Sequence, residues 1–295
     1  MAVERLRFYG TTNGTYYIDL WKAISLQARK LHRQKNICTV YGGYFVDSQA
    51  NRINLNTAAL TWVNKRAVNR GFRIWKSMIA DALKSTDGVS TGRWNDFKVY
   101  LDNAMGSSPL LPKDAGDQDL YDGTAPEWDY STLTSDDPDG PGGGNPDQFE
   151  LMIAGKTHSG SNPNYSRISL VKSWVDSRGY PDPSGDPVNT ADMSTDPLNN
   201  LMDAGDAQDD RLTVIDIEGD KSPYDPDSMF GNSATNGGSN NLQRQSVAQP
   251  SAQVPVAPIH GFQALCGLVQ IVVGSDSSSN EWELVLDVET KGESF

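Results

Sequence analysis

Near its end the chain reads FQALCGLVQIVVGSDSSSNEWELVLDVE, residues 262–289. Both apolar runs are rich in β-branched residues and partly alternate with polar ones, a pattern typical of strands. The runs at 262–274 and 282–289 are therefore predicted strands, and the turn-rich connector SDSSSNE predicts a terminal hairpin. The longest nearly apolar stretch, residues 264–273, is about half the length that a membrane-spanning helix needs, so we expect no membrane span.

The same pattern recurs along the chain, at 15–20, 37–47, 53–60, 97–102, 149–154, 166–176 and 211–219. These strands are not separated by regular helices, which favours an all-β antiparallel sandwich or barrel. Long stretches at about 103–147, 180–210 and 220–257 are rich in Asp, Gly, Pro and Asn. They are predicted as irregular loops that carry function or become ordered by a partner, or else as disordered segments. No clean linker appears, so we expect residues 1–295 to form a single domain.

Two segments have helical periodicity instead. Residues 63–83 place apolar side chains on one helix face: Val68, Phe72, Trp75, Ile79 and Leu83. Arg66, Arg70 and Arg73 fall on the opposite face at about 100° per residue. Residues 22–34 repeat the pattern less cleanly, with Leu20, Ile24 and Leu31 opposite Lys22, Arg29 and Arg33. We expect one inserted helix at each segment.

Charge is segregated along the chain. Residues 1–100 carry 16 Lys and Arg against 6 Asp and Glu, a balance of +10, whereas the remainder carries −23 in a chain of formal net charge −13. No acid interrupts the basic segment 20–36, and none lies between Asp47 and Asp81. An ordinary solvated helix mixes signs, because opposite charges one turn apart are favourable. A phosphate backbone, an acidic protein surface and plain solvation are the three interpretations that stay open.

No catalytic signature is present, and we expect no enzyme. The histidines His32, His158 and His260 are too far apart in sequence to predict a metal site. Asp114, Asp117, Asp119 and Asp122 could gather calcium if folded together, although a solvated acidic loop is the simpler interpretation. Cys38 and Cys266 are expected to be reduced, packed thiols. The segment 1–10 lacks the apolar run of a secretory signal, so we expect a soluble protein made in a reducing compartment.

The order of features resembles the capsid proteins of small circular single-stranded DNA viruses that encode a replication initiator. The resemblance rests on TYYIDLWKAISLQARKLHRQ (15–34), ALTWVNKRAVNRGFRIWKSM (59–78), RWNDFKVYLD (93–102) and the two terminal strands. It implies a single jelly roll with one or two inserted helices and long loops. It also implies a virion protein that assembles with copies of itself around a single-stranded DNA genome, with a receptor that the sequence does not reveal.

Many relatives begin with an arginine-rich arm that holds the genome, and here only Arg5 and Arg7 precede the first strand. The resemblance therefore implies that the folded domain contacts the genome through a basic inner surface. The expected nucleic-acid-binding residues are Lys22, Arg29, Lys30, Arg33, Lys35, Lys65, Arg66, Arg70 and Arg73. Trp128 and Trp174 are candidates for contacts between copies, or else for core indoles.

Two other functions compete with this one. A β-sandwich binding module for a glycan or protein would hold calcium in the Asp-rich loops. A hydrolase with scattered carboxylates would lose activity when one Asp or Glu is changed.

Overall fold

The computed structural model describes residues 3–85, 92, 94–120, 128–135, 147–155, 158–159, 165–177, 242–274 and 279–291. The chain divides into two compact units, one made of Met1–Trp174 with Asp227–Phe295 and the other of Val175–Pro226. The described residues belong to the first unit, apart from 175–177. The loop expected at 180–210 and the strand expected at 211–219 lie outside the described residues.

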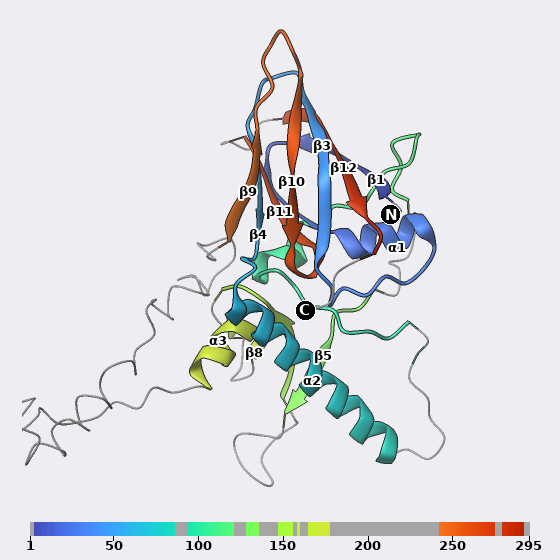
Figure 1. Cartoon of the computed structure of the whole chain (residues 1–295), viewed down its shortest axis with the longest axis vertical. Coiled ribbons are helices and arrows are strands. Elements are labelled where there is room, and N and C mark those ends of the chain that lie inside the picture. The colour runs from blue at the N-terminus through green and yellow to red at the C-terminus, as the bar shows by residue number, and fades with distance from the viewer. Residues whose placement is uncertain are drawn as a thin grey trace, which may run out of the picture. The chain divides into compact units, whose positions relative to one another are not determined.

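The first unit contains two four-stranded antiparallel sheets, so the all-β prediction is confirmed (Figure 1). One sheet has the order β1-β12-β3-β10, with β1 at Val3–Thr12, β12 at Ser279–Glu289, β3 at Cys38–Asp47 and β10 at Val256–Ala264. The other has the order β2-β11-β4-β9, with β2 at Gly14–Asp19, β11 at Leu268–Val273, β4 at Ile53–Thr57 and β9 at Gln243–Ala248. The chain changes sheet at each step from β1 to β4 and from β9 to β12. The long insertion between β4 and β9 leaves and re-enters the same sheet.

A single core lies between these sheets because the inward side chains of both contribute to one buried cluster. Alternation places every second residue there, as in β11 (Val269, Ile271, Val273) and β12 (Leu284, Leu286, Val288). Each such side chain contributes roughly 1.5–3 kcal/mol on burial. The fully buried Trp282 is wedged beside Gly10, where an added Cβ would lie 2.3 Å from the indole ring.

The terminal hairpin prediction is wrong, because β11 and β12 belong to different sheets. The predicted strand at 262–274 is also two strands, separated by the 3-10 turn η3 (Leu265–Gly267). Cys266 and Gly267 both have positive φ there, 56° and 67°, which redirects the chain from one sheet to the other. Cys38 and Cys266 are buried free thiols, as predicted.

The helices differ in how closely they match the prediction. α2 (Trp62–Ser85) includes the whole predicted segment 63–83. α1 (Leu20–Ala28) begins earlier than predicted and ends six residues before 34. Arg29 adopts a left-handed conformation with φ 50°, and its N–H and that of Lys30 both donate to the Ser25 carbonyl. This helix C-cap turns residues 29–36 into a loop, so the predicted helix at 22–34 is only half correct.

The insertion contributes a third sheet of order β5-β6-β8-β7, in which β6 and β8 are parallel. Its strands are β5 (Thr132–Ser135), β6 (Asp147–Met152), β7 (His158–Ser159) and β8 (Tyr165–Ser169). The segment predicted as a strand at 166–176 is β8 followed by helix α3 (Leu170–Asp176). Residues 97–102 are buried, yet they form only a single bridge, between Tyr100 and Met152, and no strand.

Two predicted loops contain regular elements. The stretch 103–147 includes the 3-10 helix η1 (Asn103–Ser107) and β5, and the stretch 220–257 includes β9. β9 was missed because QRQSVA alternates only weakly and relies on pairing with β4 for its conformation. Along the described residues, no helix is long and apolar enough to cross a membrane.

The close approach of β3 to β12 can be tested by a substitution at Gly43. A Cβ at this position would lie 1.9 Å from the Val285 carbonyl oxygen, so Gly43→Ala should force the two strands apart. We expect a loss of about 1–3 kcal/mol in the free energy of unfolding, measured by urea denaturation. Gly92→Ala is the matched control, because nothing lies within 4 Å of its Cβ position. Equal stability of the two variants would contradict this packing.

Candidate nucleic-acid interface

The nine predicted cations lie in two separate groups. Lys22, Arg29, Lys30, Arg33 and Lys35 lie on α1 and its following loop, and Lys65, Arg66, Arg70 and Arg73 lie on α2. Of the first group, Arg29, Lys30 and Arg33 are exposed. The second group is described below as the basic face of α2, to which the structure adds Lys76.

The basic face of α2 carries its charges around one exposed aromatic residue. At about 100° per residue, Arg66, Arg70 and Arg73 lie within about 80° of Trp62, and Lys65 and Lys76 lie within about 60° on its other side. The three arginines and Lys76 are exposed, and the Trp62 side chain is 53% exposed. Trp62 and Lys76 were not among the predicted residues. Their positions on the same helical wheel were the available signal.

Among the described residues, these charges have no acidic partner within ion-pair distance. Across the residues that the structure describes, no ion pair involves Lys65, Arg66, Arg70, Arg73 or Lys76. The first acid of α2 is Asp81, near its C-terminal end, and it pairs with Lys84 at 3.2 Å. Like charges three or four residues apart repel each other by a few tenths of a kcal/mol per pair. The helix therefore carries an unfavourable interaction that a bound polyanion would relieve.

The apolar side of α2, which lies opposite Arg66, Arg70 and Arg73, anchors the helix to the domain. Val68 is fully buried, and the Phe72 and Trp75 rings lie 5.6 Å and 5.9 Å from the ring of Phe97. The Lys35 ammonium lies 4.1 Å from the centroid of Phe72. Lys35 therefore packs on the apolar side of the helix, away from Arg66, Arg70 and Arg73, and covers an aromatic ring there.

Lys22 and Arg33 are also less available than their sequence positions suggest. Lys22 is half-buried, and this burial lowers the pKa of its ammonium group. The Arg33 guanidinium lies 3.9 Å from a carboxylate oxygen of Asp96. His32 stacks parallel to Trp21 with 6.1 Å between ring centroids, and burial lowers its pKa. Arg29 and Lys30 are the members of this group that are both exposed and outside every ion pair among the described residues.

A buried carboxylate holds the first basic group in place. Asp19 caps α1, where its Oδ1 accepts the Lys22 N–H at 3.0 Å. Its Oδ2 accepts hydrogen bonds from the Gln34 side-chain amide at 2.8 Å and the Trp128 indole N–H at 3.0 Å. Trp128 is therefore a buried indole with a hydrogen-bond partner inside this domain. Of the two alternatives for this residue, the structure agrees with a core indole.

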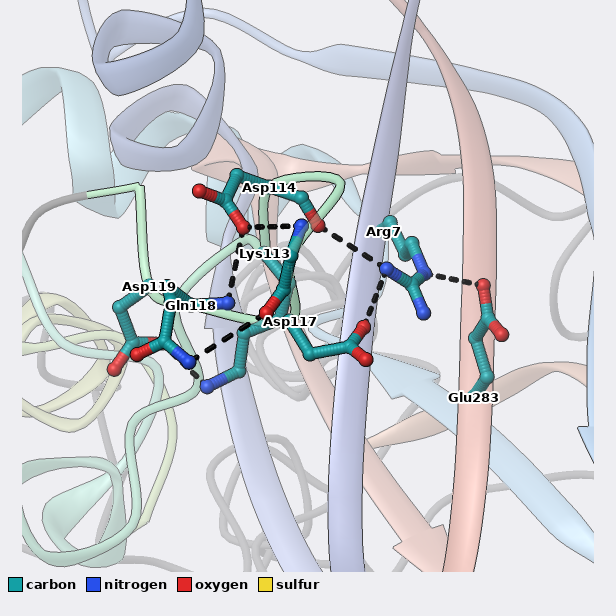
Figure 2. Close-up of polar contacts among 8 residues, drawn as sticks. Arg7, Lys113, Asp114, Asp117, Gln118, Asp119 and Glu283 are labelled. Carbon is teal, nitrogen blue, oxygen red and sulfur yellow. Dashed lines mark hydrogen bonds and ion pairs between the residues drawn. The ribbon is translucent and has the colours of Figure 1, made fainter.

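The Asp-rich loop around 114–119 contacts Arg7 of β1, which also pairs with Glu283 of β12 (Figure 2). Arg7 pairs with Asp117 and Glu283, each at 2.6 Å, and Lys113 pairs with Asp119 at 2.8 Å. The Asp114 Oδ1 accepts the N–H groups of Gly116 and Gln118 at 2.8 Å and 3.0 Å.

The carboxylates that were candidates for a calcium site are engaged in other contacts where the structure describes them. Asp114, Asp117 and Asp119 each have other partners, and the described part of the chain contains no group of three or more His, Cys, Asp or Glu residues placed to hold a metal ion. Asp122 and the DDPDG segment at 136–140 lie outside the described residues.

Comparisons with protein-family models, with curated proteins and with solved structures found no match for this chain.

The pKa of Asp19 predicts a pH-dependent stability. Burial raises this pKa from 3.8 to about 6, so the folded state disfavours the charged carboxylate. The contribution of Asp19 should be complete below about pH 4 and be lost as the pH rises through 6, a change of about 3 kcal/mol. We expect the stability difference between the native protein and Asp19→Asn to shrink by this amount from pH 4 to pH 7, in urea denaturation.

Asp287→Asn is the control of opposite sign. The Arg5 hydrogen bond lowers the pKa of Asp287, so its contribution should be present at neutral pH and be lost as the pH falls through the acid range. If Asp19→Asn differs from the native protein by the same amount at every pH, Asp19 is not a titrating buried group.

Proposed function

We propose that the chain is a capsid protein that assembles with copies of itself into an icosahedral shell and packages single-stranded DNA. The observation that carries this proposal is the basic face of α2, where exposed cations lie without acidic partners among the described residues. A surface of this kind matches a phosphate backbone, because each neutralised phosphate also releases counterions. The contacts would be to backbone phosphate and therefore independent of base sequence.

The strand order supports the structural part of the proposal. Two facing sheets of order β1-β12-β3-β10 and β2-β11-β4-β9, with the chain alternating between them, are what a single jelly roll requires. Jelly rolls occur in viral capsids and also in lectin domains, so this order is compatible with the capsid function without deciding it. The insertion between β4 and β9 would then be a long loop of the jelly roll that carries α2.

Exposed apolar side chains support self-association. Val247, Val254 and Val256 lie around the connection from β9 to β10 and are 37%, 60% and 47% exposed. β9 and β10 are also the outer strands of their sheets. Contact between copies at this place would remove apolar surface from water and cover two open strand edges.

Assembly is the first test. The purified full-length chain should form large, uniform particles, seen by light scattering and by negative-stain electron microscopy. We expect assembly to be promoted by single-stranded DNA, because the polyanion neutralises the basic face of α2. A species that stays monomeric over a wide range of salt, pH and added DNA would contradict the capsid proposal.

The salt dependence of DNA binding is the second test. Changing Arg66, Arg70 and Arg73 together to Ser should flatten the plot of log affinity against log salt for oligo(dT), by roughly 0.7 per lost phosphate contact. Fluorescence anisotropy, below the concentration at which particles scatter light, measures this slope. Arg5→Ser is the matched control, because Arg5 is already paired with Asp287 at 2.7 Å. An unchanged slope in the triple variant would assign the basic face of α2 to a protein contact instead.

A further inference from the structure

Among the residues that the structure describes, Trp62 is the most exposed large aromatic residue, at 53%, and it begins the helix that carries the basic face. The Arg66 guanidinium carbon lies 5.6 Å from the centre of its ring. Trp174 of α3 contacts the same indole, with 6.2 Å between ring centroids and 70° between the planes. Large aromatic side chains are usually mostly buried in folded proteins. An indole exposed among arginines is therefore unusual on a solvated helix face.

The neighbouring helix fixes where this indole lies. α3 approaches α2 so closely at Gly71 that a Cβ there would lie 2.6 Å from a methyl carbon of Leu170. Trp174 lies one helical turn further along α3, where it meets Trp62 at the start of α2. The contact limits the rotamers of Trp62, so ordering the indole for a ligand costs little additional entropy.

We propose that Trp62 is a stacking site for an unpaired nucleic-acid base, which makes the basic face of α2 selective for single strands over duplex. This inference rests on the proposed function, since it concerns the same face and the same polymer. The arginines would hold successive phosphates while one base turns away from its neighbouring bases and stacks on the indole. Trp174 acts as a positioning residue.

The selectivity follows from what each form of nucleic acid displays. In a duplex the flat faces of the bases are covered by their neighbours, so only the phosphates, the sugars and the base edges are available to α2. In a single strand each base can present a flat face, and every base type has one, so stacking tolerates any sequence. The cation beside the ring adds to the interaction, because Arg66 can stack on the same base.

The test compares Trp62→Ala with the native full-length chain on three probes of equal length: oligo(dT), an abasic oligonucleotide and duplex DNA. Affinities are measured by anisotropy below the concentration of particle formation. Trp62→Ala should weaken oligo(dT) binding roughly five- to hundredfold, the loss expected for one stacked base. Binding of the abasic strand and of the duplex should stay unchanged, because those probes offer only phosphates or covered bases.

Two control variants make the result specific. Trp62→Phe keeps an aromatic face and should restore most of the oligo(dT) affinity, whereas Trp94→Ala removes a tryptophan that is 45% exposed but lies outside α2, and should change nothing. Equal losses on all three probes for Trp62→Ala, or no loss on any, would overturn the stacking inference. If the native chain binds none of the probes at low salt, the proposed function itself fails. Sequence-independent binding that Trp62→Ala does not alter leaves that function standing without the stacking site.

Discussion

One buried carboxylate connects the β-sandwich to the insertion that carries the basic helix. Asp19, at the end of β2, accepts hydrogen bonds from Gln34 and Trp128, and Gln34 in turn accepts the Val99 N–H at 2.6 Å and donates to the Val99 carbonyl at 3.1 Å. These buried contacts fix the segment that contains Phe97, on which the apolar side of α2 packs. The position of α2 therefore depends on a polar network in which each buried group needs its partner.

That support explains how α2 can carry a row of arginines that have no ion-pair partner among the described residues. Self-repulsion among its arginines opposes helix formation by a few tenths of a kcal/mol per pair, whereas burial of Val68 and its apolar neighbours is worth several times more. Tertiary packing thus decides that the helix exists, and its charged side remains available for a partner. The acidic loop at 114–119 is different, because its carboxylates have cationic partners. Asp117 pairs with Arg7 of β1, and Asp119 pairs with Lys113, whose N–H donates to the Arg7 carbonyl.

Elements with strong periodicity were predictable from the sequence, and elements that depend on distant partners were not. The apolar spacing from Val68 to Leu83 identified α2 because that face repeats at the helical period. Residues 166–176 contain several β-branched and aromatic residues, which predicted a strand, yet after Ser169 they form the helix α3. Residues 97–102 (FKVYLD) also contain β-branched and aromatic side chains, but the network around Gln34 and the bridge from Tyr100 hold them outside any sheet. Among the site residues, the exposure of Arg66, Arg70 and Arg73 was predictable, whereas the packing of Lys35 on Phe72 was not.

The sequence by itself determined the antiparallel β class, the segregation of positive charge into the first 100 residues and the amphipathic character of α2, because each of these is a local pattern of side chains. Only the tertiary structure decided that β11 and β12 lie in different sheets, that β9 pairs with β4 across the insertion, and that Trp62 meets Trp174 beside the arginines. Those outcomes depend on contacts between residues far apart in the chain. The free energy of such a contact depends on both partners, so the pattern of one local segment does not predict it.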